Sequence, residues 1–308
     1  MRALAAMVFA VTWLTQQAGA QPLDLTRGGA IELTWRDESE IRDQEKTAIV
    51  SGDARAVRGN VTVLADQLVA HYRKKAGSTG EASAAGNEIY RLEAHGHVRI
   101  VTPTDEAVGD AAVYDIDQAV LVMTGAALRL TTPQQTLTAR DSLEYWSDKR
   151  MAVARGAAVV VTHDGRRISA DTLVGYTAAP KSDQPAPAKA DPSAASGTLE
   201  RVEAYGNVEV RTATDNGRAD RGLYVAALDS AWLLGNVRLS SGNGMQMKVD
   251  AAVANKKTGI FRTVNNPGNR AQGMIPPSPS KAPLAAAPAP IGKPPPVAAP
   301  VAIDKPKL

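Results

Sequence analysis

The stretch that decides the fold is residues 204–210, Ala-Tyr-Gly-Asn-Val-Glu-Val, followed at 219–224 by Ala-Asp-Arg-Gly-Leu-Tyr. The same phrase recurs along the chain: a small residue, a glycine, a short apolar run and, later in the unit, an aspartate. Because a repeat sets the architecture before any single residue does, the chain is predicted to be a stacked structure whose function lies in a surface. The repeated positions are Gly52, Gly96, Gly125, Gly156, Gly206 and Gly235, and Asp66, Asp110, Asp141, Asp171, Asp220 and Asp250.

The apolar runs alternate apolar and polar residues with a period of two. Residues 98–102, 208–211 and 237–240 show this pattern, which is typical of half-buried strands. The sequence has no long capped helical stripe, so a nearly all-β fold of about six repeated units is predicted. Polar clusters between the runs predict hairpin turns at 43–46, 115–118, 147–150 and 255–258.

The repeated glycine and aspartate call for a structural reason. Glycine weakens a strand, so its recurrence indicates a bend, a bulge or the close approach of another layer. Bends stacked from unit to unit would fold a sheet over on itself along one line. The aspartate is expected to mark a second corner, where its carboxylate accepts bonds from local N–H groups. Carboxylates repeated in every unit are expected to be structural, and no enzymatic activity is predicted.

The two ends of the chain differ from the repeats. Residues 1–20 have a charged start, an apolar run and an A-x-A site, which predicts a cleavable secretory signal. Residues 21–264 are predicted to form one domain, and the Pro- and Ala-rich residues 265–308 a disordered tail. Two long polar joins, at 74–88 and 179–197, are predicted to be surface insertions.

The composition narrows the classes of partner. The chain of 308 residues has no cysteine and a net charge of only +3, so neither a disulfide framework nor a nucleic-acid partner is expected. His95 and His97 are two residues apart and would share the solvated face of a strand. Because no third ligand accompanies them, no metal site is predicted. No cofactor is expected either.

The repeated phrases, above all those at 204–210 and 234–239, resemble the OstA-like (LptA) family of lipopolysaccharide transport proteins. The resemblance covers about residues 25–264 and departs from the family pattern in two places that bear on the fold. Trp35-Arg36 stands where the family usually has Ala-Asp. In the third unit, Leu128 and Leu130 are out of phase with Gly125, which predicts a bulge.

The resemblance implies an antiparallel sheet folded into a V-shaped β-jelly roll, whose interior holds the acyl chains of lipid A. It further implies a periplasmic protein that carries lipopolysaccharide from the inner to the outer membrane. Residues in phase with the glycine, or two after the aspartate, are predicted to line the groove. They are Val98, Ile100, Val160, Val208, Val210, Val237 and Leu239, with Leu68, Leu143 and Leu173. The residues could equally fill a dry core.

The resemblance also implies partners that pair with the open edges of the sheet. The predicted edge strand comprises Ile31, Glu32, Leu33 and Thr34. Its expected partners are the inner-membrane and outer-membrane lipopolysaccharide transport components, or a second copy in a head-to-tail oligomer. Two alternatives stay open: a structural β-solenoid that polymerises through its edges without a ligand, and a relative of the inner-membrane component. On the outer face, the basic residues Arg99, Arg211 and Arg238 are expected to be solvated.

Overall fold

The computed structural model describes residues 31–74, 87–177, 199–255 and 257–275. The predicted signal at 1–20, most of both insertions and residues 276–308 of the predicted tail lie outside the described residues. Within the described ranges, helix is confined to one short 3-10 turn, η4 (Ala226–Leu228). None of the helical structure in those ranges is long and apolar enough to span a bilayer.

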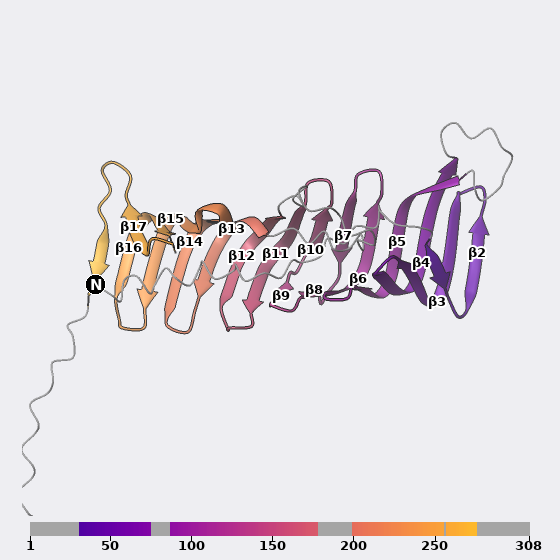
Figure 1. Ribbon diagram of the computed structural model, residues 1–308, viewed down its shortest axis with the longest axis horizontal. Coiled ribbons are helices and arrows are strands. Elements are labelled where there is room, and N and C mark those ends of the chain that lie inside the picture. Colours follow the sequence, from indigo (N-terminus) through magenta and orange to yellow (C-terminus); the bar gives the residue numbers. More distant parts are fainter. Residues whose placement is uncertain (1–30, 75–86, 178–198, 256, 276–308) are drawn as a thin grey trace, which may run out of the picture. The chain divides into compact units, whose positions relative to one another are not determined.

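The described residues form one 18-stranded sheet in which every pairing is antiparallel, as the family resemblance implies (Figure 1). The first strands are β1 (Glu32–Thr34), β2 (Glu38–Arg42), β3 (Thr47–Arg58), β4 (Val61–Lys74), β5 (Asn87–Val101), β6 (Glu106–Asp115), β7 (Val120–Thr124), β8 (Arg129–Thr131) and β9 (Gln135–Thr138). The remainder are β10 (Ser142–Trp146), β11 (Met151–Thr162), β12 (Arg167–Thr177), β13 (Leu199–Arg211), β14 (Asp215–Val225), β15 (Ser230–Ser241), β16 (Gln246–Asn255), β17 (Ile260–Val264) and β18 (Gln272–Met274).

The long strands each contribute to two halves of the sheet, and short strands cover one half only. At the first edge, β2 pairs with the beginning of β3 and β1 pairs with its end. At the last edge, β17 and β18 divide β16 in the same way. In the middle, β7 and β10 continue one half while β8 and β9 continue the other. The sheet is therefore a pair of half-sheets joined along one line.

The repeated glycines lie on that line. In β13, Gly206 and Asn207 have φ of 72° and 49°, and the register with β14 shifts between Tyr205 and Val208. The same pair of positive φ values occurs at Gly52, Gly96, Gly156 and Gly235 and at the residue after each. A bulge of this kind bends a strand and increases its twist. The bend predicted from the glycines is thus confirmed.

The repeated aspartates lie on the same line, so the prediction that they mark a second corner is wrong. All the repeated aspartates except Asp250 reach forward to the glycine of the next unit: a Cβ added to Gly235, for example, would lie 2.5 Å from Asp220 Oδ2. Asn236, which follows that glycine, donates from Nδ2 to the same oxygen at 2.8 Å. The glycine is required both for its left-handed backbone and for the space that the carboxylate occupies.

The series of carboxylates has one more member, Asp37, which precedes the first repeated aspartate, Asp66. Asp37 lies against Gly52, where a Cβ would come within 2.8 Å of the aspartate Cβ. The family usually has Ala-Asp where this chain has Trp35-Arg36. Asp37, one residue later, therefore takes the place of the family's aspartate. At the other end, Asp250 Oδ2 accepts a bond of 2.7 Å from the Asn266 N–H and one of 2.8 Å from Asn269 Nδ2.

The third unit is the irregular one, as its phase predicts, but the strand breaks instead of bulging. β7 ends at Thr124 and Gly125 follows with φ of 152°. Asp110 Oδ2 accepts a bond of 2.7 Å from the Ala126 N–H, which anchors the crossing segment. Leu128, in that segment, is 1% exposed, and a Cβ added to Gly109 would lie 3.0 Å from its Cδ2. The irregular segment therefore fills the interior.

The predicted turns close the hairpins β2–β3, β6–β7, β10–β11 and β16–β17. The sheet extends past Val264, where the sequence placed the start of the tail. β18 pairs with β16 through Gln246↔Met274 and Lys248↔Gln272. Three residues of strand among polar and glycine neighbours give no period-two signal, which explains why this end was set too early.

Candidate functional site

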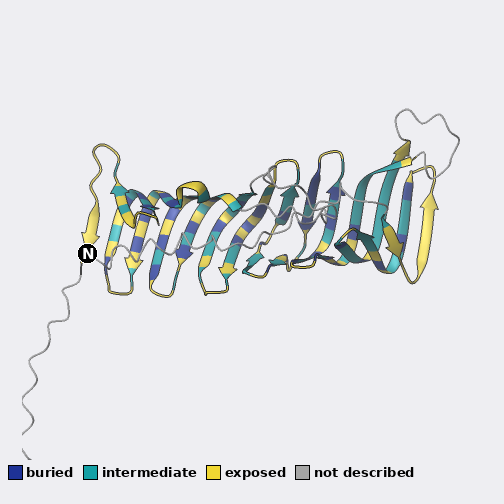
Figure 2. Cartoon of the chain, viewed as in Figure 1, coloured by how far each residue is buried: buried dark blue, intermediate teal, exposed yellow. Residues whose placement is uncertain are grey.

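The interior of the folded sheet contains the residues predicted to line a groove. Figure 2 shows buried and exposed positions alternating along the strands, as a period of two requires. The larger set is buried: Val98, Ile100, Val208, Val210, Val237, Leu239, Leu143 and Leu173. Val160 and Leu68 are partly buried and pack against the same core. All the predicted residues thus face one interior, whose inner surface is apolar.

The two half-sheets face one another across this interior. Leu233 pairs with Gly222 in one half, while Gly217 pairs with Leu239 in the other. Yet a Cβ added to Gly217 would lie 3.1 Å from Leu233 Cδ1 and 3.2 Å from Leu239 Cδ2. Residues on either side of the bulge meet only if the strands fold back at the line of glycines. The small inward residues leave room for side chains from the opposite half.

A hollow of about 220 Å³ lies between the half-sheets near the first edge. It receives Leu68 and Ile100 from the predicted set, and Ile31 and Leu33 from the predicted edge strand. Leu92 from β5 also lines it. The hollow is therefore the place where the predicted groove and the predicted edge meet, and its walls come from both halves of the sheet.

Sequence reasoning missed several residues that complete the interior. Tyr114, Leu121, Met123 and Leu128 are all nearly inaccessible members of the core. Tyr114 and Leu121 also line the hollow. The predicted leucines lie two residues after an aspartate, and Tyr114 lies four residues after Asp110. Because alternate residues of a strand share a face, Tyr114 could have been predicted to point inward as well. Leu128 had no such signal, because the strand is interrupted before it.

The edges of the sheet carry exposed apolar side chains. At the first edge, Leu33, Trp35 and Ile41 are exposed, and β1 and β2 pair only with β3 among the described strands. At the last edge, Ile260, Val264, Met274 and Ile275 are exposed, and β17 and β18 pair only with β16 within the same residues. A strand with unpaired N–H and C=O groups and apolar side chains is a template for another strand.

The outer face carries the polar and charged side chains. His95 and His97 do not act together there, because the bulge between His95 and Val98 breaks the alternation. His95 Nε2 lies 3.1 Å from Glu93, whereas His97 Nδ1 lies 2.8 Å from Asp66. The hydrogen bond to Asp66 and then its charge raise the pKa of His97. Within the described ranges, no three His, Cys, Asp or Glu side chains are grouped so that they could hold a metal ion.

Charge pairs cover much of this outer face. Arg155 Nε donates to Glu144 at 2.6 Å, and Arg99 Nε donates to Glu106 at 2.8 Å. Partial burial opposes ionisation of Glu144, but the bonds from Arg155, Trp146 and Ser142 outweigh it and lower the pKa of that carboxyl. These paired groups keep the outer face polar and hydrated, while the inner face is apolar.

Comparison with known proteins agrees with this geometry. The family model described as the LptA/(LptD N-terminal domain) LPS transport protein matches residues 36–141 and again residues 137–259. An uncharacterized protein of Rhizobium meliloti (strain 1021), R00383, is 26% identical over 111 residues, which are 36% of this chain. The chain spans 58% of the length of that relative.

Among solved structures, the chain is similar to LptH of Pseudomonas aeruginosa, described as the LptA homologous periplasmic component of the lipopolysaccharide transport device. That similarity has a TM-score of 0.34 at 15% identity, over 42% of this chain and 83% of LptH. The two family matches together cover most of the sheet, from the first carboxylate of the series to β16. This chain therefore belongs to the non-enzymatic family of LptA and the N-terminal domain of LptD, the lipopolysaccharide transport proteins.

Proposed function

We propose that this protein is a periplasmic bridge that binds lipopolysaccharide and carries it from the inner to the outer membrane through the interior of the folded sheet. The observation that carries the proposal is the continuous apolar inner surface, which runs from β3 and β4 to β15 and β16 and opens into the hollow at the first edge. Acyl chains leave water with a gain of about 25 cal/mol per Å² of buried apolar surface.

The interior must open to accept such chains along its length. Val98 and Val237 are 0% exposed, so acyl chains reach them only when the two half-sheets move apart. At the hollow, Leu68 and Leu92 already face space between the halves. Loading therefore begins at the first edge and proceeds toward β16, each step exchanging contacts between the halves for contacts with the ligand.

A photo-reactive residue placed at single positions tests this function. Inward substitution at Leu68, Val208 and Val237 should give crosslinks to lipopolysaccharide, the strongest at Leu68, which lines the hollow. The matched control is Val161, which is 38% exposed on β11 and should give none. Absence of crosslinks at every inward position, in folded variants, would remove the proposal.

The open edges support the proposed partners. The inner- and outer-membrane transport components, or a second copy in head-to-tail order, would add their strands beside β1 and β2 or beside β17 and β18. Ile41 is 75% exposed on β2, so Ile41→Lys should weaken association without unfolding the chain. Leu228→Lys, at an exposed residue of η4, is the control. Equal loss of association in both variants would argue against edge pairing.

A filled interior also fits a second function, a structural protein that polymerises through its edges and holds no ligand. Its specific support is the near-complete burial of Val98, Val208 and Val237. This function requires concentration-dependent oligomers that ignore lipopolysaccharide, and it requires no crosslinks at Leu68. Export by the predicted signal at 1–20 is common to both functions, and cleavage after residue 20 is tested by sequencing the mature N-terminus.

A further inference from the structure

Three basic side chains lie in one row across the outer face near the last edge. Arg218 on β14 is directly opposite Arg238 on β15, and Arg238 is directly opposite Lys248 on β16. We call Arg218, Arg238 and Lys248 the cation row. Residues directly opposite on antiparallel strands have Cβ atoms about 5 Å apart, and like charges in such pairs are destabilising. The row is therefore maintained at a cost to the free protein.

Several arginines elsewhere on the outer face are matched to carboxylates. Arg73 reaches Glu88 at 2.7 Å and Asp117 at 2.6 Å. The cation row is different, because only Arg218 has a carboxylate partner, Glu209, at 3.2 Å. Within the ranges that the structure describes, Arg238 and Lys248 make no side-chain hydrogen bond or ion pair with another residue.

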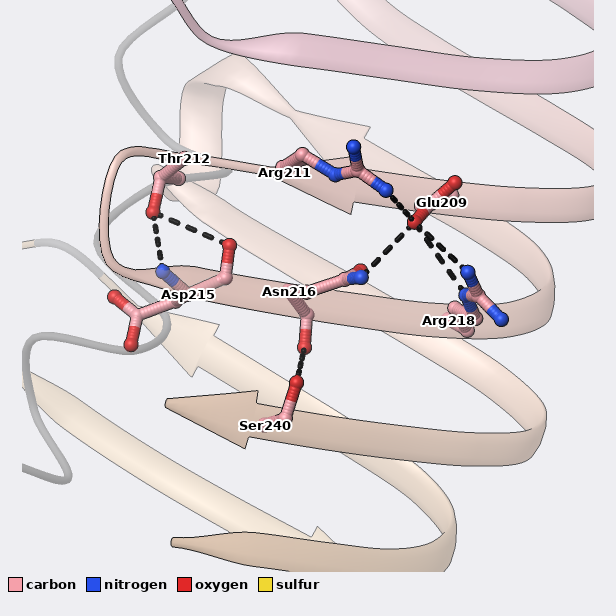
Figure 3. A network of polar contacts seen from close by, with 7 residues as sticks. All are labelled: Glu209, Arg211, Thr212, Asp215, Asn216, Arg218 and Ser240. Atoms are coloured by element: carbon pink, nitrogen blue, oxygen red, sulfur yellow. Dashed lines mark hydrogen bonds and ion pairs between the residues drawn. The ribbon is translucent and has the colours of Figure 1, made fainter. Parts of the chain in front are cut away.

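Two carboxylates, Glu209 and Asp250, lie beside the row, and both are already bound to other groups. Figure 3 shows Glu209 between three donors, and its Oε1 accepts from Arg211 Nη2 at 2.8 Å, Asn216 Nδ2 at 2.9 Å and Arg218 Nη2 at 3.2 Å. Asp250, two residues beyond Lys248, is held by Asn269 and by the Asn266 N–H. These two bonds lower its pKa, and the charge of Lys248 adds to the effect. Within the described residues, neither carboxylate forms an ion pair with Arg238 or Lys248.

The row borders a hollow of about 610 Å³, whose lining also includes the apolar Leu239, Met247 and Met274. Amide and hydroxyl groups share its walls with the three cations: Asn216, Ser240, Gln246 and Gln272. Unpaired Arg and Lys donors suit the oxygens of a phosphate group, and neutral amides and hydroxyls suit sugar hydroxyls. A protein, by contrast, would offer a flat interface of larger extent.

We propose that the cation row and its hollow bind a phosphate group carried on a sugar. Arg238 and Lys248 supply the charge-assisted bonds to the phosphate, Arg218 adds positive charge, and the amides position the sugar. The three cations point outward from the sheet, but Leu239 and Met247 of the apolar interior also line the hollow. The test must therefore separate phosphate binding from the binding of acyl chains. The phosphosugar could be the headgroup of a phosphorylated lipid or a free phosphorylated sugar.

The test compares wild-type protein with the double variant Arg238→Gln/Lys248→Gln. Glucosamine 6-phosphate should raise the melting temperature of the wild type, with glucosamine alone as the phosphate-free probe. A charge-assisted hydrogen bond contributes enough that the double variant should bind at least about tenfold more weakly. The control is Arg99→Gln, which removes an arginine already paired with Glu106 and should bind within about twofold of wild type.

The stability of the double variant without ligand is a second measurement. Because it removes like charges that face one another, its melting temperature in chloride should equal or exceed that of the wild type. This result also shows that the variant is folded. Micelles of lipid A with and without its phosphates then identify the source of the phosphate. Row-dependent binding of the soluble phosphosugar indicates a free sugar ligand, and row-dependent binding of phosphorylated lipid A alone indicates the lipid headgroup.

Equal binding by wild type and the double variant, for both glucosamine 6-phosphate and phosphorylated lipid A, would overturn the proposal. The crosslinking test at Leu68 is read separately with the same double variant. If the double variant loses phosphate binding but keeps the crosslinks at Leu68, the phosphate site is supported and the carrier function stands. If the wild type binds the phosphosugar but gives no crosslinks at Leu68 or at the other inward positions, the carrier function is refuted and the phosphate site stands.

Discussion

Gly235→Ala tests the physical account of the fold line most directly. Gly235 has φ of 77°, and a left-handed backbone costs an L-residue about 1–2 kcal/mol. The new Cβ would also lie 2.5 Å from Asp220 Oδ2 and 3.0 Å from its Cγ, so the carboxylate must move. Moving it breaks the 2.8 Å bond from Asn236, which contributes about 1 kcal/mol at an exposed site. The expected loss of unfolding free energy is about 2–3 kcal/mol.

Two comparisons isolate the part of this cost that belongs to the carboxylate. Gly59 has φ of 60° but nothing within 4 Å of an added Cβ, so Gly59→Ala should cost only the backbone part, about 1–2 kcal/mol. In an Asp220→Ala background the clash is absent, and Gly235→Ala should fall to the same value. A urea-denaturation cycle over residues 220 and 235 should therefore give a coupling of about 1 kcal/mol. A cost at Gly235 equal to that at Gly59, with no coupling, would refute the reasoning.

Three further predictions concern packing and charge. Val98→Ala, at 0% exposure, should lower the unfolding free energy by about 2 kcal/mol, whereas Val161→Ala, at 38%, should change it by about 0.5 kcal/mol or less. Leu128→Ala should cost about 2–5 kcal/mol despite its place between strands, because its side chain fills the interior; a surface-like value in urea melts would contradict this. The pKa of His97 is raised from 6.5 by Asp66, so the pair stabilises the fold fully below the unfolded pKa and loses this effect as pH rises through the folded pKa. An NMR titration should show the raised pKa in wild type and its return toward 6.5 in Asp66→Asn.

The sequence predicted the strands, the turns and the inward residues because their signals are local. A period of two identifies one face of a strand without knowledge of its neighbours, and this was enough for Val98, Val208 and Val237. A glycine in a strand likewise signals a bend at its own position. The family resemblance then turned a pattern of strands into a folded sheet.

The failures of the sequence reading concern contacts between units. Asp220 belongs to one repeat and occupies the space left by the glycine of the next, and no pattern within a single unit reveals which glycine a carboxylate reaches. Asp37 was missed for the same reason, since its partner Gly52 lies in a later strand. The cation row depends on the register of three strands, which the turns alone did not specify.

The forward reach of the aspartates gives the array a direction. In a unit that begins at the glycine and ends at the aspartate, the glycine lies against the carboxylate of the preceding unit. The aspartate of the unit lies against the glycine of the following unit. Duplication or loss of a whole unit should therefore be tolerated, because every aspartate still precedes a glycine that leaves room for it. A rearrangement within a unit would instead place a carboxylate against a side chain. At the last unit, where Asn266 and Asn269 receive Asp250, the recipient no longer needs a glycine. That substitution marks where the array can end without an unmatched partner.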